Sequence, residues 1–212
     1  MKNAISFICY FSLSVAFCCA QTNNIINTSF KQNNICPSYI SNSISYGHIL
    51  NCSNPSVGTP FYYNICYQGT PFLGSSVPNN NRGYQITKTG VAYVGFGLWI
   101  KSVSAVEYIQ MELAESLKAN HHYAFECYLS RANKVRYAVS NFGAYFSNDS
   151  VSMPSADILP FTPQINNPAG NYFTDTLNWM PFTGTYLAQG GEQYVILGNF
   201  NSIAENKVLY IS

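Results

Sequence analysis

The stretch "TGTYLAQGGEQYVILGNF", Thr183 to Phe200, places two runs of β-branched and aromatic residues on either side of a glycine pair. Adjacent glycines adopt the positive φ angles that tight hairpin turns require. The stretch therefore predicts two strands joined by a hairpin turn at Gly190 and Gly191, with Glu192 as a turn residue. A phosphate-binding loop is the weaker interpretation, because the residues after Gly191 favour a strand and not the helix that such a loop needs.

Runs of the same kind recur along the chain. They are "GYQITKTGVAYVGFGLWI" (83–100, divided near Gly90), "VEYIQMELA" (106–114), "HHYAFECYLSRA" (121–132) and "YAVSNFGAYFS" (137–147). Residues 115–123 have room for a single helical turn at most. Many short strands separated by Gly, Pro and Asn turns predict an all-β protein, an antiparallel β-sandwich that forms one domain over residues 21–212.

The N-terminal residues "MKNAISFICYFSLSVAFCCA" combine one lysine, an apolar run from Ala4 to Cys19 and a small residue at position 20. This pattern predicts a secretory signal peptide over residues 1–20 and an exported mature chain. The apolar run is shorter than the roughly 18 residues of a membrane span, so no transmembrane span is expected in the mature chain. Lipid attachment at Cys18 or Cys19 is the alternative to cleavage after Ala20.

The composition limits the classes of partner. Of the 212 residues, 47% are hydrophobic and 16% aromatic, but only 9% are charged, against about a quarter in an ordinary globular domain. Loss of Lys2 with the signal would leave a net charge near zero. Since no basic stripe is visible in the sequence, a nucleic-acid partner is not expected.

Two common kinds of catalytic site have no support in the sequence. A serine hydrolase would need a G-x-S-x-G turn, and the sequence contains none. A zinc hydrolase would need spaced histidines, but His121 and His122 are neighbours and His48 stands alone. No metal site and no cofactor are therefore expected.

A glycosidase would need two carboxyl groups on either side of the scissile bond. The candidates are Glu107, Glu112, Glu126, Asp175 and Glu192. The sequence brings no two of them together. Glu107 shares the apolar face of its strand, where an arginine or backbone donors would hold it in a structural role. The chain is therefore expected not to be an enzyme.

Two loops concentrate the residue types that recognise sugars, because flat rings stack on sugar faces and amides match sugar hydroxyls. They are "TPFYYNICYQG" (59–69) and "PNNNRGYQ" (78–85). The candidate ligand-binding residues are Tyr62, Tyr63, Asn64, Arg82, Tyr84 and Gln85, with Tyr67 and Asn80 in the same loops. The alternative is that Phe61 and Tyr63 close one end of the sandwich while Tyr62 is merely exposed.

Four cysteines remain after removal of the signal: Cys36, Cys52, Cys66 and Cys127. They allow three complete pairings. Cys36 and Cys66 lie in turn-rich segments, which favours a bridge between them in an exported chain. Cys127 falls on the apolar face of an alternating run and is expected in the core.

Several stretches in chain order carry a family resemblance, including "GTPFYYNIC", "VPNNNRGYQ", "VEYIQMEL" and "GTYLAQGGEQYVILGNF". The chain resembles the jelly-roll domain, similar to carbohydrate-binding and galactose-binding-like modules, found near the N-terminus of large surface proteins of gliding Gram-negative bacteria. Those proteins often end in an OmpA-like or gliding-motility-associated, secretion-type C-terminal module.

The resemblance implies an antiparallel jelly-roll β-sandwich of galactose-binding-like type, a Cys36–Cys66 disulfide and Cys52 as a free core thiol. It also implies a location in the periplasm, on the outer-membrane surface or outside the cell. Many jelly-roll modules hold a structural calcium ion. Lys31 and Ser212 stand where related chains favour carboxylates, so calcium is not expected here.

The functional expectation is a secreted or cell-surface, non-catalytic module that binds glycans or mediates adhesion. The alternative is a structural or protein-interaction domain of an OmpA-like or gliding-associated envelope protein, whose partner would be another envelope protein. A polysaccharide-active enzyme is the least favoured interpretation. The final residues "ENKVLYIS" (205–212) read as part of a strand, which favours a domain that continues beyond Ser212.

Overall fold

The computed structural model describes residues 23–38, 43–44, 48–70, 74–99, 106–202, 205 and 207–211. Every regular element in these ranges is a β-strand, and all strand pairs are antiparallel. The predicted all-β class is confirmed. Within these ranges, no helix is long and apolar enough to cross a membrane. The expected signal peptide (1–20) and Ser212 lie outside the described residues.

The largest sheet has five strands in the order β1-β6-β12-β9-β10. Their bounds are Cys52–Ser53 (β1), Ile109–Glu112 (β6), Tyr194–Gly198 (β12), Gly143–Ser147 (β9) and Ile165–Asn166 (β10). Strand β12 lies at the centre, where Val195 is opposite Met111 on one side and Phe146 on the other. Both edges of β12 are therefore occupied.

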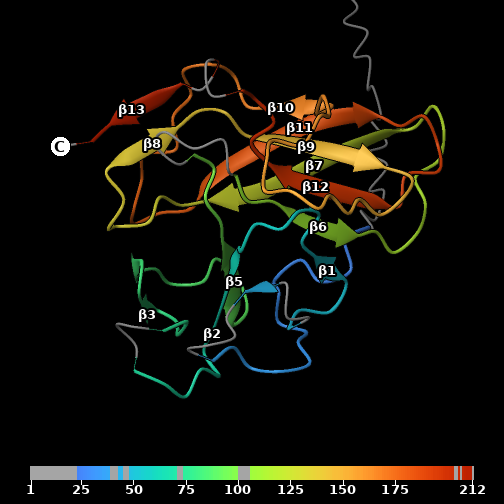
Figure 1. Cartoon of the computed structure of the whole chain (residues 1–212). Helices are drawn as coiled ribbons and strands as arrows, with labels where there is room; N and C mark the ends of the chain where they lie inside the picture. The colour runs from blue at the N-terminus through green and yellow to red at the C-terminus, as the bar shows by residue number, and fades with distance from the viewer. Residues whose placement is uncertain are drawn as a thin grey trace, which may run out of the picture.

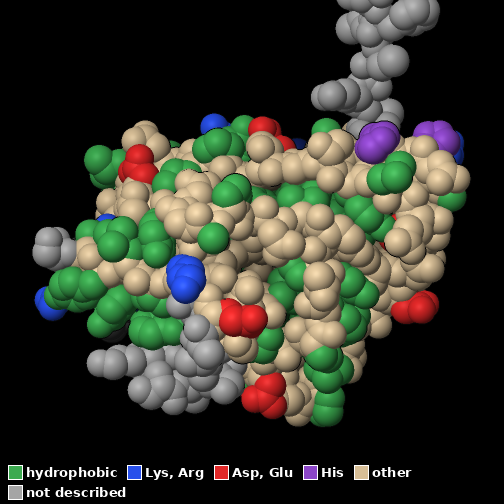
Figure 2. Space-filling model, turned by 90° about the horizontal axis from the view of Figure 1, so that it is seen from above, with side chains coloured by type: hydrophobic (Ala, Val, Ile, Leu, Met, Phe, Trp, Pro, Cys, Tyr) green, Lys and Arg blue, Asp and Glu red, His purple; other side chains and the backbone are tan. Residues whose placement is uncertain are grey.

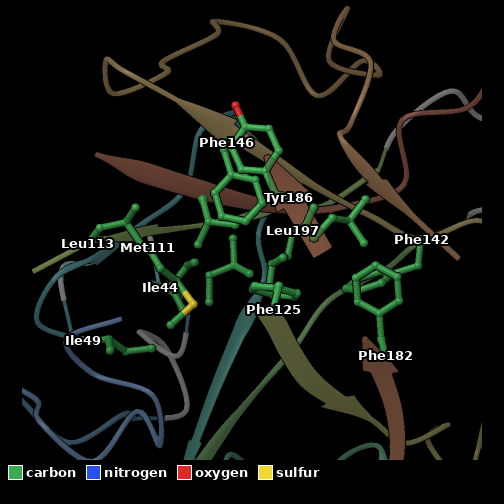
Figure 3. Close-up of a cluster of buried hydrophobic side chains, with 14 of the residues drawn as sticks. Ile44, Ile49, Met111, Leu113, Phe125, Phe142, Phe146, Phe182, Tyr186 and Leu197 are labelled. Carbon is green, nitrogen blue, oxygen red and sulfur yellow. The ribbon is translucent and has the colours of Figure 1, made fainter. Parts of the chain in front are cut away.

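The longest strands, β7 (His122–Leu129) and β11 (Met180–Leu187), pair with each other and form a second layer. Phe125 of β7 meets Phe146 of the large sheet edge to face at 5.9 Å, and Phe182 of β11 meets Phe142 at 4.9 Å. Figure 3 shows these rings gathered between the two layers. Their edge-to-face contacts are the favoured geometry of packed aromatic rings, and they join the layers as in a β-sandwich.

The opposite face of the five-stranded sheet is also buried. Ile196 of β12 packs there in a second cluster with Val106, Tyr108 and Leu159. Gln110 attaches the covering segment, because its side chain donates to Ser150 Oγ at 2.8 Å and accepts from the backbone N–H of Val151 at 2.8 Å. The central strand is thus enclosed on both faces, as its mainly apolar sequence requires.

The predicted hairpin at Gly190 and Gly191 is wrong. The two glycines do adopt positive φ angles of 99° and 97°, but the strands they join belong to different layers. Strand β11 pairs with β7, whereas β12 pairs with β6 and β9. Because β12 has no free edge, the turn carries the chain from one layer of the sandwich to the other.

Three smaller pairs complete the structure: β2 (Phe61–Asn64) with β5 (Ala92–Gly95), β3 (Asn79–Asn80) with β4 (Gly83–Tyr84), and β8 (Tyr137–Val139) with β13 (Val208–Tyr210). Figure 1 shows β2, β3 and β5 beneath the sandwich and β8 with β13 at its left end. The predicted break near Gly90 is confirmed, since this residue has a φ of 68° and separates β4 from β5. The single helical turn allowed for residues 115–123 is not formed.

The expected Cys36–Cys66 disulfide is present, with the two Cα atoms 5.8 Å apart. Cys52 and Cys127 are free thiols and half-buried. Both pack against the main core. Burial raises the pKa of Cys52 and raises that of Cys127 to about 12, so both thiols stay protonated and unreactive at neutral pH.

Burial of β12 on its second face predicts a large effect from Ile196→Ala. We expect the free energy of unfolding to fall by about 2 to 4 kcal/mol, because the substitution leaves a cavity against Tyr108 and Leu159. Urea denaturation measures the change. Leu187→Ala, at a side chain that is 50% exposed, serves as the control and should cost less than about 1 kcal/mol. Equal effects of the two substitutions would contradict the burial of this face.

Candidate functional site

Three of the predicted ligand-binding residues are closed to solvent. Tyr62, Tyr63 and Asn64 are 0%, 2% and 3% exposed. The Tyr62 hydroxyl donates to the carbonyl of Phe30 at 2.9 Å, and the Tyr63 hydroxyl donates to Asn81 Oδ1 at 3.0 Å. A buried ring offers no face to a ligand, so the structure removes these three from the candidate surface. Tyr67 and Asn80 are buried as well.

The other three predicted residues lie at the surface around the β3–β4 pair. The Arg82 guanidinium lies over the Phe61 ring, 5.3 Å from its centre. Tyr84 is 49% exposed, and Gln85 Oε1 accepts a hydrogen bond from Ser130 Oγ at 3.0 Å. The six predicted residues therefore divide into a buried group that supports the loop and a second group beside residues 130–134, in which Arg82 and Tyr84 are exposed and Gln85 is half-buried.

The carboxylate of Glu107 is held by backbone donors and a hydroxyl, and backbone donors were one of the two arrangements expected, the other being an arginine. It accepts hydrogen bonds from the N–H groups of Gly97 at 2.6 Å and Thr59 at 3.2 Å, and from the Thr59 hydroxyl at 3.1 Å. These bonds connect segments that are far apart in the sequence. Glu107 thus has a structural role.

The other acidic candidates are held separately. Glu112 accepts from Asn51, and Glu126 accepts from the Tyr128 hydroxyl. Asp175 closes its own turn, and hydrogen bonds from Asn178 and Leu177 hold the pKa of its carboxyl below the ordinary value. Within the described ranges, each of these three carboxylates and that of Glu107 accepts hydrogen bonds from a different set of donors.

Glu192 is the buried exception among the acidic side chains, at 3% exposure. Its carboxylate accepts from the Tyr186 hydroxyl at 2.5 Å and from the backbone N–H groups of Gln189 at 2.8 Å and Gly190 at 3.0 Å. Burial alone would raise the pKa of Glu192, but these hydrogen bonds outweigh it and hold the pKa below the ordinary value. The Gly-Gly turn is therefore folded around an internal anion.

Tyr186 is the second member of this arrangement. Burial, with the hydrogen bond to Glu192, raises the pKa of Tyr186 to about 12. Its ring stacks on Phe146 at 4.8 Å with an interplanar angle of 9°, and Figure 3 shows the two rings lying one over the other. The Tyr186 hydroxyl is therefore a fixed, neutral donor to Glu192.

A cleft of about 560 Å³ opens beside this turn. It is lined by Tyr145, Phe146, Ser147, Asn148, Asp149, Ser150, Val151, Phe161, Gln164, Tyr186, Gln189, Gly190 and Glu192. Tyr145 and Phe161 stack at 4.6 Å with an interplanar angle of 4° and form its aromatic wall. Asn148, Asp149 and Gln164 are exposed at the rim. Flat rings and hydrogen-bonding groups thus meet in one hollow.

A second hollow, of about 380 Å³, shares Phe161 with the cleft. Its other lining residues include Asn141, Asn166, Asn201 and Ser140. The Ser140 hydroxyl is buried and has no hydrogen-bond partner in the described part of the chain. Such a group normally finds a partner in water or a ligand.

The sequence contained only a faint sign of this cleft. Tyr145 follows the alternation of its strand onto the face away from the main core, but nothing local pointed to Phe161 or to the burial of Glu192. Within the described ranges, no three His, Cys, Asp or Glu side chains gather as a metal site would require.

Comparisons with known proteins add no assignment for this site. No family model matches the chain, and neither a curated protein nor a solved structure matches it. The chemistry of the cleft therefore has to be inferred from its own residues.

The hydrogen bonds of the Glu192 carboxylate predict that Glu192→Gln destabilises the folded protein. We expect a loss of about 2 kcal/mol in the free energy of unfolding at neutral pH, since charge-assisted hydrogen bonds become neutral ones. The folded-state pKa lies below the ordinary value of about 4.3. The contribution of the carboxylate is therefore complete above that value and is lost as the pH falls through the folded-state pKa.

Urea denaturation from neutral to acid pH measures this difference, which should shrink on acidification. Glu115→Gln removes an exposed carboxylate and is the matched control, with little effect at any pH. A Glu192→Gln protein as stable as the wild type at neutral pH would contradict the role of this anion.

Proposed function

We propose that this chain is an exported, non-catalytic β-sandwich module that binds glycans in the cleft beside the 189–192 turn. The observation that supports this most directly is the combination of a stacked aromatic wall, Tyr145 with Phe161, and a rim of amide, hydroxyl and carboxylate groups. Sugars present apolar ring faces and hydroxyl groups, which require both kinds of surface.

The dimensions of the site fit such a ligand. The cleft volume of about 560 Å³ lies within the range of roughly 300 to 1,000 Å³ that is usual for small-molecule sites. Phe161 also lines the second hollow, whose other lining residues include Asn166 and Asn201. A glycan longer than one residue would extend past the shared Phe161 from the first hollow into the second.

The state of Glu192 favours binding over hydrolysis. A glycosidase acid must carry a proton at the working pH, which requires a raised pKa. The pKa of Glu192 is lowered, and donors from Tyr186, Gln189 and Gly190 already engage its oxygens. This carboxylate fixes the cleft wall and offers no proton.

The finer fold and the location belong to the same proposal. A jelly-roll, galactose-binding-like arrangement is supported by the sequence resemblance and by the two packed antiparallel layers. The disulfide and the signal-like N-terminus favour the periplasm, the outer-membrane surface or the extracellular space. Figure 2 shows isolated charged side chains among neutral and hydrophobic ones on one face, as expected for a surface that recognises hydroxyl groups.

Binding of the mature chain to an array of cell-wall and algal polysaccharides tests this function. We expect binding to neutral glycans that persists in high salt, because the cleft contacts are hydrogen bonds and ring stacking. Phe161→Ala and the double variant Asn148→Ala/Asp149→Ala should each weaken the affinity for the best ligand about tenfold, which corresponds to about 1.4 kcal/mol. Isothermal titration calorimetry measures the change.

The matched control is Thr183→Ala/Thr185→Ala, at two exposed positions of β11. This variant should bind as the wild type does. An array without any glycan ligand would count against the proposal. It would favour the alternative, a structural or protein-interaction domain of an OmpA-like or gliding-associated envelope protein.

A further inference from the structure

Two segments that lie side by side are rich in positively charged residues. The chain has 10 Lys and Arg residues, and half of them fall in the segments 82–88 and 131–136. They are Arg82, Lys88, Arg131, Lys134 and Arg136. We call the surface formed by these two segments the basic surface.

Hydrogen bonds hold the two segments together. The backbone N–H of Lys134 donates to the carbonyl of Arg82 at 3.2 Å, and Lys134 Nζ donates to the carbonyl of Asn81 at 3.3 Å. The backbone N–H of Tyr84 donates to Asn133 Oδ1 at 2.7 Å. Residues about fifty positions apart in the sequence thus form one continuous surface.

No carboxylate of the described residues forms an ion pair with these five cations. Arg82 and Lys88 lie over the rings of Phe61 and Tyr128 instead. Arg131 donates to the carbonyls of Thr174 and Val135.

Asp175 is near Arg131, whose backbone N–H donates to the Asp175 carbonyl at 2.9 Å. The Asp175 carboxylate, however, accepts from the donors of its own turn. Glu126 also borders this surface, since it accepts from the hydroxyl of Tyr128, the ring that Lys88 covers. Five cations against these two carboxylates leave the basic surface with an excess of positive charge, and such a surface attracts anions.

The basic surface also carries exposed apolar and amide groups. Tyr84 is 49% exposed and Ile86 is 60% exposed. The Trp179 indole donates to the carbonyl of Ile86 at 2.8 Å, and this bond places the indole at the border. Gln85 and Asn133 add amide groups, with Gln85 hydrogen-bonded to Ser130 and Asn133 hydrogen-bonded to the backbone N–H of Tyr84. Cations, a ring face and neutral hydrogen-bonding groups thus occur side by side.

We propose that the basic surface binds an anionic polysaccharide, a chain whose sugars carry carboxylate or sulfate groups. The cations would meet the anionic groups, Tyr84 would stack on a sugar face, and the amides would meet hydroxyls. The disulfide and the expected export favour a polymer outside the cytoplasm over a nucleic acid. This site is separate from the cleft at Glu192 and does not depend on binding there.

Retention on immobilised polyanions tests the proposal. Polygalacturonate supplies carboxylates, heparin supplies sulfates, and a DNA oligonucleotide is the comparison. Arg82→Gln/Lys134→Gln should weaken polysaccharide binding on the order of tenfold at low salt. The double variant makes two fewer charge contacts with the polymer, and binding then releases fewer counterions. The control, Lys31→Gln/Lys118→Gln, changes the net charge equally at exposed positions elsewhere and should change the affinity by less than about twofold.

Each other outcome overturns the proposal. Equal loss in both double variants would mean that net charge alone drives retention, and tighter binding to DNA than to either polysaccharide would assign the surface to nucleic acid.

Thermal unfolding checks that the variants fold. If the loss of the Arg82 ring contact unfolds the protein, Lys88→Gln/Arg136→Gln replaces the first variant with the same expected loss. Phe161→Ala, which alters the cleft, should leave retention unchanged.

Discussion

The central strand β12 has neighbours on both edges and packed side chains on both faces, and the rest of the architecture follows from this enclosure. Val195 points into the main core and Ile196 into the second cluster, and both are 0% exposed. Two edge partners, β6 and β9, leave no place for β11, which pairs instead with β7 in the facing layer. The segment that connects β11 to β12 must therefore cross between the layers in a few residues, and this crossing requires both glycines of the turn.

The crossing between the layers also explains why a carboxylate, that of Glu192, is buried in a chain that has few charged residues. Removing an ionised group from water is costly unless hydrogen bonds replace its hydration. Glu192 receives three such bonds, and two of the donors are backbone N–H groups of the turn itself. The same anion therefore stabilises the connection between the layers and forms one wall of the cleft. A substitution of Glu192 is therefore expected to affect both the stability of the fold and the shape of the cleft.

The cleft and the basic surface use different chemistry. The cleft depends on stacked rings and neutral hydrogen-bonding groups, whereas the basic surface depends on cations without carboxylate partners. Two aromatic residues of the 59–69 loop, half-buried Phe61 and buried Tyr63, contribute to the basic surface indirectly. Phe61 supports the Arg82 guanidinium, and the Tyr63 hydroxyl binds Asn81, whose carbonyl accepts from Lys134. Tyr63, which the sequence marked as a ligand contact, thus helps to position neighbours that face solvent.

The sequence by itself determined the local properties of this protein: the runs that become strands, the break at Gly90, and the positive φ angles of Gly190 and Gly191. Each depends on alternation or on the conformational freedom of a few adjacent residues. Only the tertiary structure decided which strands pair, and hence that the glycine turn joins two layers. It also decided that Tyr62 and Tyr63 are buried, that Glu192 is enclosed, and that cations from segments 82–88 and 131–136 meet. These features arise from contacts between residues distant in the sequence, and burial of apolar surface drives such contacts without specifying the partner in any local pattern.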